Sequence, residues 1–465
     1  MIYTENIIVG EQSSRLSSAI FALLLAMPLV ATVLFGAVDN VSWILLSLAW
    51  TAMLMFWIAD AWKGKGLLLN TSAIQLPMLG FLIIGLIQLL PIGGRDAGAL
   101  PGVPISQTLS LDPYETRFFL LRLVVYIVFF AGCLTFINNE SRLKKAVLMV
   151  IIFGAGMAFF GILQRLANPD GIYGFRSTPQ SIPFGPFVNR HHFAAFMEMT
   201  AGVCVGLLFG RRLAKDKKVL LVIAVVVMGV AIALTSSRGG MVGIISVLAF
   251  AGVLNYLSGR WSRKKRSSAE KPVGIHSKAS LAAGAVALVF VVFGIVLSLG
   301  GNDELFRGIG LTEVQGGVSN GRAHFWAVAV QIFLDHPILG AGFEAFGVAF
   351  TKHDTWMGAF RVEQAHNEYL QTLADSGIAG FICVCAFIYL LFRKGLKTIG
   401  EAHGLRRDAA AGALAGCFGL LIHSFFDFPL RTHSNAFFFL LLCAIATVPI
   451  RSGRSENAKR KRHAT

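Results

Sequence analysis

The chain has 465 residues, of which 55% are hydrophobic and only 14% are charged. Soluble domains carry about 25% charged residues, so this composition excludes a series of ordinary soluble domains. A formal charge of +16 would favour a nucleic-acid partner in a soluble protein. In so apolar a chain, it first indicates the cytoplasmic loops of a membrane protein, and we expect no nucleic-acid partner.

Twelve apolar stretches approach the length of about 20 residues that a bilayer-spanning helix needs. In chain order they cover 17–37, 41–61, 73–92, 117–137, 146–164, 193–210, 219–236, 240–257, 279–299, 377–393, 408–426 and 435–450. The predicted fold class is therefore all-α, a polytopic membrane protein of about twelve transmembrane helices.

The basic residues orient these helices. If the N-terminus is cytoplasmic, 29 of the 41 Lys and Arg residues fall in inner segments, as the positive-inside rule requires. We therefore expect a multi-pass protein in contact with membrane lipids, with both termini in the cytoplasm. The predicted organisation is an N-terminal tail (1–16), helices one to nine (17–299), an outer loop (300–376), helices ten to twelve (377–450) and a basic tail (451–465).

The outer side carries the other twelve basic residues, of which eleven are Arg. Arg binds phosphate through a planar fork, so this bias favours an anionic, phosphate-like ligand. Ordinary surface Arg, with Lys depleted from outer loops, explains the bias equally well. The twelve are Arg95, Arg117, Arg122, Arg165, Arg176, Arg190, Arg238, Arg307, Arg322, Lys352, Arg361 and Arg431.

Two of these arginines lie close to apolar segments. Arg238 occupies the turn Thr235-Ser-Ser-Arg-Gly-Gly240 between two predicted spans, which keeps it at the membrane–water boundary. Arg122 lies inside the fourth span, and a charge within a membrane is a candidate functional group. Snorkelling at a helix end is the structural alternative for both. Glu198, in the sixth span, is a candidate ion-pair partner for one of them.

The outer loop contains two helical patterns. Gly321-Arg-Ala-His-Phe-Trp326 opens the first, which ends at His336-Pro337, and the glycines at 340 and 342 predict a turn rather than a phosphate cradle. Arg322 falls in the first turn, where the guanidinium and the helix amides could bind one anion.

The second pattern begins at Ala365-His-Asn-Glu-Tyr-Leu370 and ends at Asp375-Ser-Gly377. Its helix start would keep His366 neutral, which suits a general base, although a lone surface histidine is the alternative. The sequence contains neither a convincing metal-ligand cluster nor a nucleotide-binding loop, so we expect no metal and no cofactor.

Several stretches together resemble the O-antigen ligase and O-antigen polymerase superfamily, bacterial membrane transferases that use undecaprenyl-pyrophosphate-linked sugars. The resemblance spans about residues 17–450 and is strongest over 235–380. Besides the turn and the two loop helices above, it rests on Ser110-Leu-Asp-Pro113, Pro186-Phe-Val-Asn-Arg-His-His-Phe193 and His423-Ser-Phe-Phe-Asp-Phe-Pro-Leu430.

The resemblance implies a C-type glycosyltransferase fold with a large periplasmic helical loop, in the bacterial inner membrane. It implies that Arg238 and Arg322 engage the donor pyrophosphate and that His366 is the base on the acceptor hydroxyl. Further substrate contacts are expected at Arg190, Arg361, Arg122, Asn189 and Tyr369.

The implied donor is an undecaprenyl-pyrophosphate-linked glycan, and the acceptor is lipid A–core for a ligase or a growing glycan for a polymerase. The stretches around 189–193 and 423–428 favour polysaccharide or exopolysaccharide assembly slightly. Glycan transfer to protein and an inorganic carbon carrier are the alternatives. A carrier should show inverted repeats and charges near the bilayer midplane, and neither pattern is evident.

Overall fold

The computed structural model describes residues 14–92, 107–168, 171–179, 181–210, 213–264, 321–355 and 362–450. These residues form thirteen α-helices, which confirms the all-α class. They are α1 (Ser14–Val33), α2 (Asn40–Lys63), α3 (Leu76–Gln88), α4 (Pro113–Phe136), α5 (Glu140–Ala167), α6 (Arg190–Leu208), α7 (Lys215–Leu234), α8 (Arg238–Lys264), α11 (Gly321–Asp335), α12 (Phe346–His353), α13 (Glu368–Glu401), α14 (Leu405–His423) and α15 (His433–Thr447).

Short elements complete the described part of the chain. They are the 3-10 helices η1 (Phe35–Ala37), η2 (Ala73–Gln75) and η4 (Pro429–Arg431), and the strands β1 (Gly171–Ile172) and β2 (Arg176–Ser177). The two strands pair antiparallel, with Gly171 opposite Ser177. The hairpin lies between α5 and α6.

Eight helices are long and apolar enough to cross a membrane: α1, α2, α4, α5, α6, α7, α8 and α13. The predicted spans at 73–92 and 435–450 coincide with the shorter apolar helices that end at Gln88 and Thr447. The predicted span at 408–426 overlaps α14. The stretch 279–299 lies outside the described residues. The chain is therefore a multi-pass membrane protein, and twelve spans remain a prediction.

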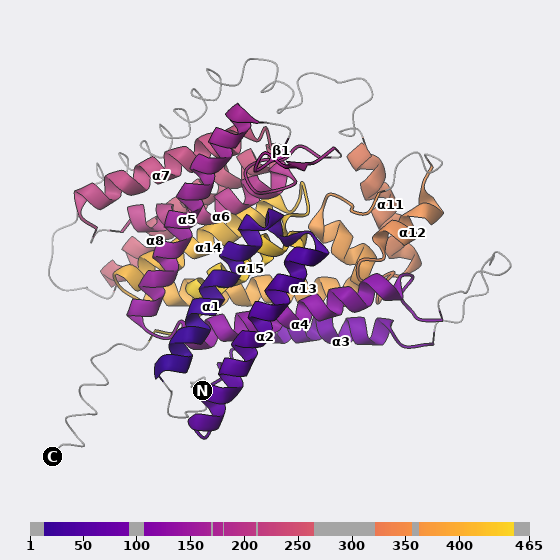
Figure 1. Cartoon of the computed structure of the whole chain (residues 1–465), viewed down its shortest axis with the longest axis horizontal. Helices are drawn as coiled ribbons and strands as arrows, with labels where there is room; N and C mark the ends of the chain where they lie inside the picture. The colour runs from indigo at the N-terminus through magenta and orange to yellow at the C-terminus, as the bar shows by residue number, and fades with distance from the viewer. Residues whose placement is uncertain are drawn as a thin grey trace.

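The centre of the bundle is formed by α6, α14 and α15 (Figure 1). Every residue of α15 is buried. Small residues let α6 and α14 approach closely, because a Cβ added to Gly202 would lie 2.5 Å from the backbone nitrogen of Gly416. Helices in membranes pack through such small-residue contacts. The starts of α6 and α15 and the end of α14 are thereby held in fixed relative positions.

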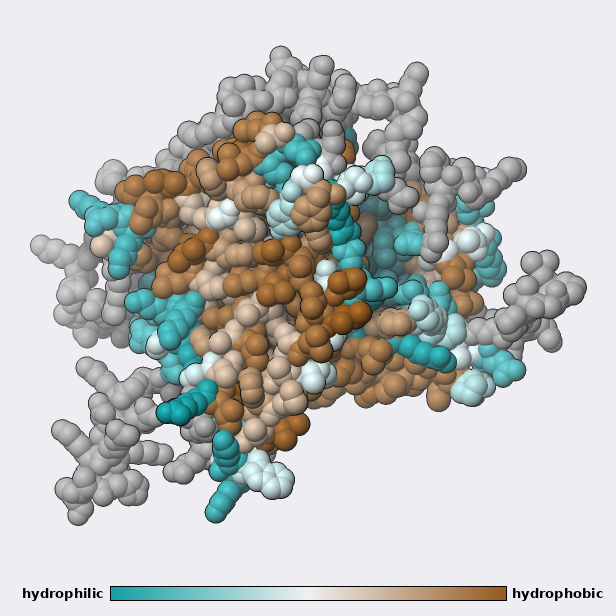
Figure 2. Space-filling view, in the orientation of Figure 1, coloured by the Kyte–Doolittle hydropathy of each residue, from teal (hydrophilic) through white to brown (hydrophobic). Residues whose placement is uncertain are grey.

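The surface of the bundle is apolar around its middle. Figure 2 shows brown surface over α1, α2 and α5, with teal patches at both ends and in a recess beside the α11–α12 end. Ile44, Leu48 and Ile58 of α2 each expose at least 60% of their surface. In water such a face would be unfavourable, whereas lipid tails cover it at no cost.

Helices α11 and α12 form a second, smaller core against the start of α13. It contains Phe325, Ile332, Phe346, Phe350 and Ala374. Helix α11 ends at Asp335, directly before His336-Pro337, as predicted. The predicted turn follows, with positive φ at Gly340 and Gly342, and the nitrogen of Ala341 donates to the carbonyl of Ala374 at 2.8 Å. The turn after α11 is thus hydrogen-bonded to α13.

The structure has a break at the predicted boundary, Gly377. The sequence predicts a loop helix that ends before Gly377 and a separate membrane span that begins there. The range of α13, Glu368–Glu401, contains both segments, which are separated at Gly377, where φ is +61° and ψ is −162° and neither angle is helical. Glycine adopts that conformation without a steric penalty, so the chain can change direction there between the two segments.

Candidate active site

The two arginines singled out from the sequence stand at the starts of helices. Arg238 is the first assigned residue of α8 and is exposed, and Arg322 is the second residue of α11 and is half-buried. Both helix starts lie near His423. The ring of His423 lies against Gly239 at the start of α8, and the Arg322 guanidinium is close enough to interact electrostatically with the same ring. Two positive helix ends with a guanidinium each can bind an anion.

His366 directly precedes Asn367, the N-cap of α13. Its Nδ1 lies 3.2 Å from Asp427 Oδ1, and its ring packs edge-on against Phe428 at 4.8 Å and stacks over Phe325 at 6.1 Å between ring centroids. Its φ is +52°, a left-handed conformation that costs a non-glycine residue about 1–3 kcal/mol. The His366 ring therefore bonds to a carboxylate. The sequence alone predicts only its position at the start of a helix.

Asp427 is 1% exposed, and its second carboxylate oxygen has no hydrogen-bond partner. Burial alone would raise the pKa of this carboxyl group. The hydrogen bond from His366 and the charges of His191, His192 and His366 outweigh burial, so the pKa lies well below its usual range. The carboxylate is thus ionised and holds Nδ1 of His366, which leaves Nε2 on the side of the ring away from Asp427. Asp427 lies in the stretch His423–Leu430, and no local signal in the sequence indicates its role.

The start of α6 lies beside the turn that carries Arg238. Asn189 caps α6, because its side-chain oxygen accepts a hydrogen bond from the nitrogen of His191 at 2.8 Å. Nδ1 of His191 lies 2.8 Å from Ser237 Oγ. Arg190 is half-buried between these residues in the chain, and its nitrogen donates to the carbonyl of Ile182 at 2.9 Å. Asn189 therefore orients its neighbours through a helix cap.

The proposed pairing of Glu198 with Arg238 or Arg122 is wrong. Glu198 Oε1 instead lies 2.7 Å from Nδ1 of His423, and both side chains are buried. The sequence could not indicate this partner, since 225 residues separate the two. Packing of α6 against α14 brings them together.

Tyr369, Arg122 and Arg361 are the other predicted substrate contacts. The hydroxyl of Tyr369 donates to the carbonyl of Leu421 at 2.7 Å, so this oxygen already connects α13 to α14. Arg122 is half-buried in α4, and its Nε has no hydrogen-bond partner. Arg361 lies outside the described residues.

At least three of the twelve outer basic residues form ion pairs within the protein. Lys352 lies 2.5 Å from Asp335. Arg176 binds both carboxylate oxygens of Asp39, at 2.5 and 2.8 Å. Arg431 lies among three carboxylates, 2.8 Å from Glu344, 2.7 Å from Asp375 and 3.8 Å from Glu368. Burial lowers the pKa of Arg431, but the three carboxylates raise it above its ordinary value. These cations already have carboxylate partners, so the composition of the predicted outer side overstates its capacity for anions.

No group of three or more His, Cys, Asp and Glu side chains within the described ranges is arranged to hold a metal ion.

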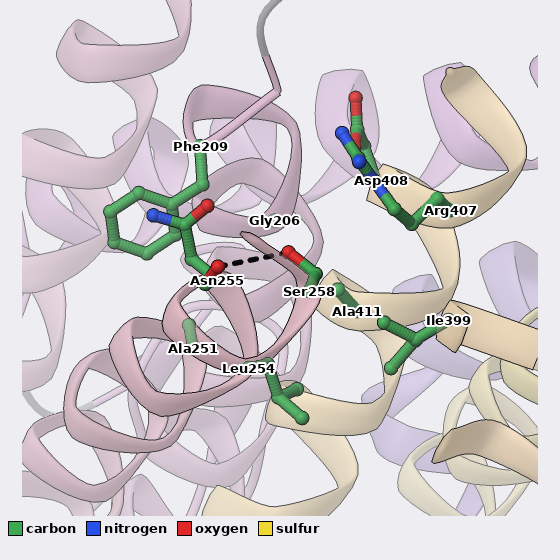
Figure 3. Close-up of a pocket in the computed structure, with 10 residues that line it drawn as sticks. All are labelled: Gly206, Phe209, Ala251, Leu254, Asn255, Ser258, Ile399, Arg407, Asp408 and Ala411. Atoms are coloured by element: carbon green, nitrogen blue, oxygen red, sulfur yellow. Dashed lines mark hydrogen bonds and ion pairs between the residues drawn. The ribbon is translucent and has the colours of Figure 1, made fainter. Parts of the chain in front are cut away.

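A small pocket lies at the opposite ends of α6, α8 and α14 from the candidate site (Figure 3). Asn255 and Ser258 come from late in α8, and Arg407 and Asp408, which pair at 3.0 Å, come from the start of α14. The helix lengths separate this pocket from Arg238 and His423.

Residues 223–385 match the O-antigen ligase family. The resemblance to the O-antigen ligase and polymerase superfamily is thereby confirmed. The matching segment includes Arg238, Arg322 and His366 and indicates a membrane enzyme of the glycan ligase or polymerase type, which acts on a lipid-linked glycan and a glycan acceptor. No curated protein matches the chain.

Proposed function

We propose that this protein transfers a glycan from undecaprenyl pyrophosphate to an acceptor hydroxyl at the outer face of the bacterial inner membrane. The observation that carries the proposal is the His366–Asp427 pair next to two arginine-bearing helix starts. A base with an orienting carboxylate and an anion site are the two parts that displacement of a pyrophosphate requires.

In the proposed reaction the acceptor oxygen attacks the anomeric carbon of the donor. The bond from that carbon to the pyrophosphate oxygen breaks, and its electron pair leaves with the pyrophosphate. Arg238 and Arg322 stabilise the charge that grows on the leaving oxygen, an interaction that strengthens in the transition state. His366 takes the acceptor proton at Nε2, and Asp427 stabilises the resulting imidazolium. A single displacement inverts the anomeric configuration.

Arg190, Arg361, Arg122, Asn189 and Tyr369 are secondary positions in this proposal. Arg122 is favoured among them because its side chain is half-buried in α4 and its buried Nε lacks a hydrogen-bond partner. The acceptor is lipid A–core or a growing glycan, and protein hydroxyls fit the same chemistry. The distribution of basic residues along the sequence supports cytoplasmic termini and therefore a periplasmic site.

A strain that lacks the gene for this protein tests the proposal. It is expected to accumulate undecaprenyl-pyrophosphate-linked glycan and to lose the ligated or polymerised product, which gel profiles of surface glycans and analysis of extracted lipids would measure. Complementation with the intact gene is the control. Unchanged glycans together with impaired solute uptake would contradict the proposal and favour a carrier.

Replacement of Asp427 by Asn is expected to lower the transfer rate by roughly 10²–10⁴-fold, the contribution typical of general acid–base catalysis, because His366 loses its orienting charge. The folded-state pKa of Asp427 is depressed, so the stability from its charge is present above the unfolded value of about 3.9 and is lost only as the pH falls towards the folded value. Between about pH 6 and pH 8 the carboxylate stays ionised, so titration of Asp427 itself should not change the defect within that range.

The measurement is the initial rate of transfer by purified Asp427→Asn and unmodified protein across that pH range. Asp335→Asn is the matched control, because Asp335 also accepts hydrogen bonds from a histidine, His353, but lies one-third exposed at the end of α11. A defect in Asp427→Asn that disappears at either end of the range would argue against the assigned role.

A further inference from the structure

The turn that carries Arg238 is held between histidines from two other helices. On one side, Nδ1 of His191 in α6 lies 2.8 Å from Ser237 Oγ, and the same hydroxyl accepts a hydrogen bond from the nitrogen of Gly240 at 3.1 Å. On the other side, the ring of His423 in α14 lies against Gly239. A Cβ added to Gly239 would lie 2.5 Å from Cδ2 and 2.6 Å from Nε2 of that ring, closer than side chains approach.

Glu198 determines how the His423 ring is oriented. Its Oε1 lies 2.7 Å from Nδ1 of His423, and the side chains of Glu198 and His423 are 0% and 1% exposed. Neither group can contact a substrate at this depth. Replacing a buried ion pair with apolar side chains is often neutral or stabilising, so general stability does not account for this pair. Its directional bond instead turns the edge of the ring towards the backbone of the Arg238 turn.

We propose that His191 and His423, the latter oriented by Glu198, are positioning residues that hold Arg238 where it binds the donor pyrophosphate. This inference rests on the proposed function. The turn contains Ser236 with φ of +52°, a conformation that surrounding contacts must maintain. A shift of about 1 Å in a charged group can cost up to 100-fold in rate, so fixing this turn matters for anion binding.

Binding of undecaprenyl pyrophosphate to the purified full-length protein in lipid nanodiscs tests the inference. Gly239→Ala inserts a methyl group against the His423 ring and is expected to weaken binding by roughly tenfold, since it displaces Arg238. Gly252→Ala is the matched control in the same helix, because no atom lies within 4 Å of the Cβ that it adds. Its affinity should equal that of the unmodified protein.

A double-mutant cycle separates positioning from general damage to the fold. In a protein that already carries Arg238→Ala, Gly239→Ala should cause no further loss of binding, because its effect acts through the Arg238 side chain. Glu198→Ala should weaken binding, whereas Glu198→Gln should retain most of it, because the amide oxygen can still accept from His423. This pair of variants also tests the inference if Gly239→Ala fails to fold.

The outcomes distinguish the inference from the function on which it rests. Additive losses from Gly239→Ala and Arg238→Ala would overturn the positioning role, and so would unchanged binding in both Gly239→Ala and Glu198→Ala. Full binding by Arg238→Ala itself would overturn the proposed donor site and, with it, this inference.

Discussion

Replacement of His366 by alanine is expected to abolish glycan transfer while the protein remains folded in the membrane. The ring is half-buried and lies at the junction between the α11–α12 core and α13, with its Nδ1 bound to Asp427. Without it, the acceptor hydroxyl loses the base that Asp427 orients. General-base catalysis contributes about 10²–10⁴-fold, which is enough to bring the product below detection.

The measurement is product formation by purified His366→Ala with a lipid-linked donor and an acceptor glycan. His353→Ala is a matched control, because Nε2 of His353 also bonds to a carboxylate, Asp335, at 3.0 Å, but that carboxylate is one-third exposed whereas Asp427 is buried. It should retain full activity. Near-normal product from His366→Ala would refute the assignment of the base.

Replacement of Arg322 by alanine is expected to eliminate product as completely. Arg322 is half-buried at the start of α11, where the helix amides and the guanidinium can act on the same phosphate oxygens. Loss of one such charge-stabilising donor costs about 10²–10³-fold in rate. Arg322→Lys should recover only part of the activity, because lysine retains the charge but loses the planar, two-pronged geometry.

This prediction is checked by the transfer rate and by the affinity for undecaprenyl pyrophosphate, measured on the same preparations. Arg117→Ala is the control, since Arg117 is an exposed arginine near the start of α4 and its removal changes the net charge equally. An Arg322→Ala protein that binds and transfers normally would remove Arg322 from the proposed anion site. Equal losses in Arg117→Ala would indicate a long-range effect of charge instead.

Much of the site could be predicted from local sequence. Pro337 ends α11, and the Ser-Arg-Gly turn separates α7 from α8, so the sequence positions Arg322 and Arg238 near helix starts. These features depend on residues within one or two turns of each other, which is the range over which helix signals act. The sequence likewise predicts His366 at the beginning of a helix, but it does not predict the φ of +52° at this residue.

The partners of these residues could not be predicted. Asp427 is 61 residues from His366, and His423 is 225 residues from Glu198. Sequence spacing indicates contacts along one helix, but it does not indicate which face of one helix packs against which face of another. Arg431 shows the same limit, because only the packing of η4 against α13 reveals that carboxylates surround it.

By itself, the sequence determined that this chain is an all-α membrane protein and that arginines and a histidine stand where helices begin. Apolar length and turn residues act locally, so they can be recognised without a fold. The tertiary structure decided which charges bind each other and which remain available to a ligand. It paired Arg431 with three carboxylates, Glu198 with His423 and Asp427 with His366, because a buried charge is stable only where packing provides a partner.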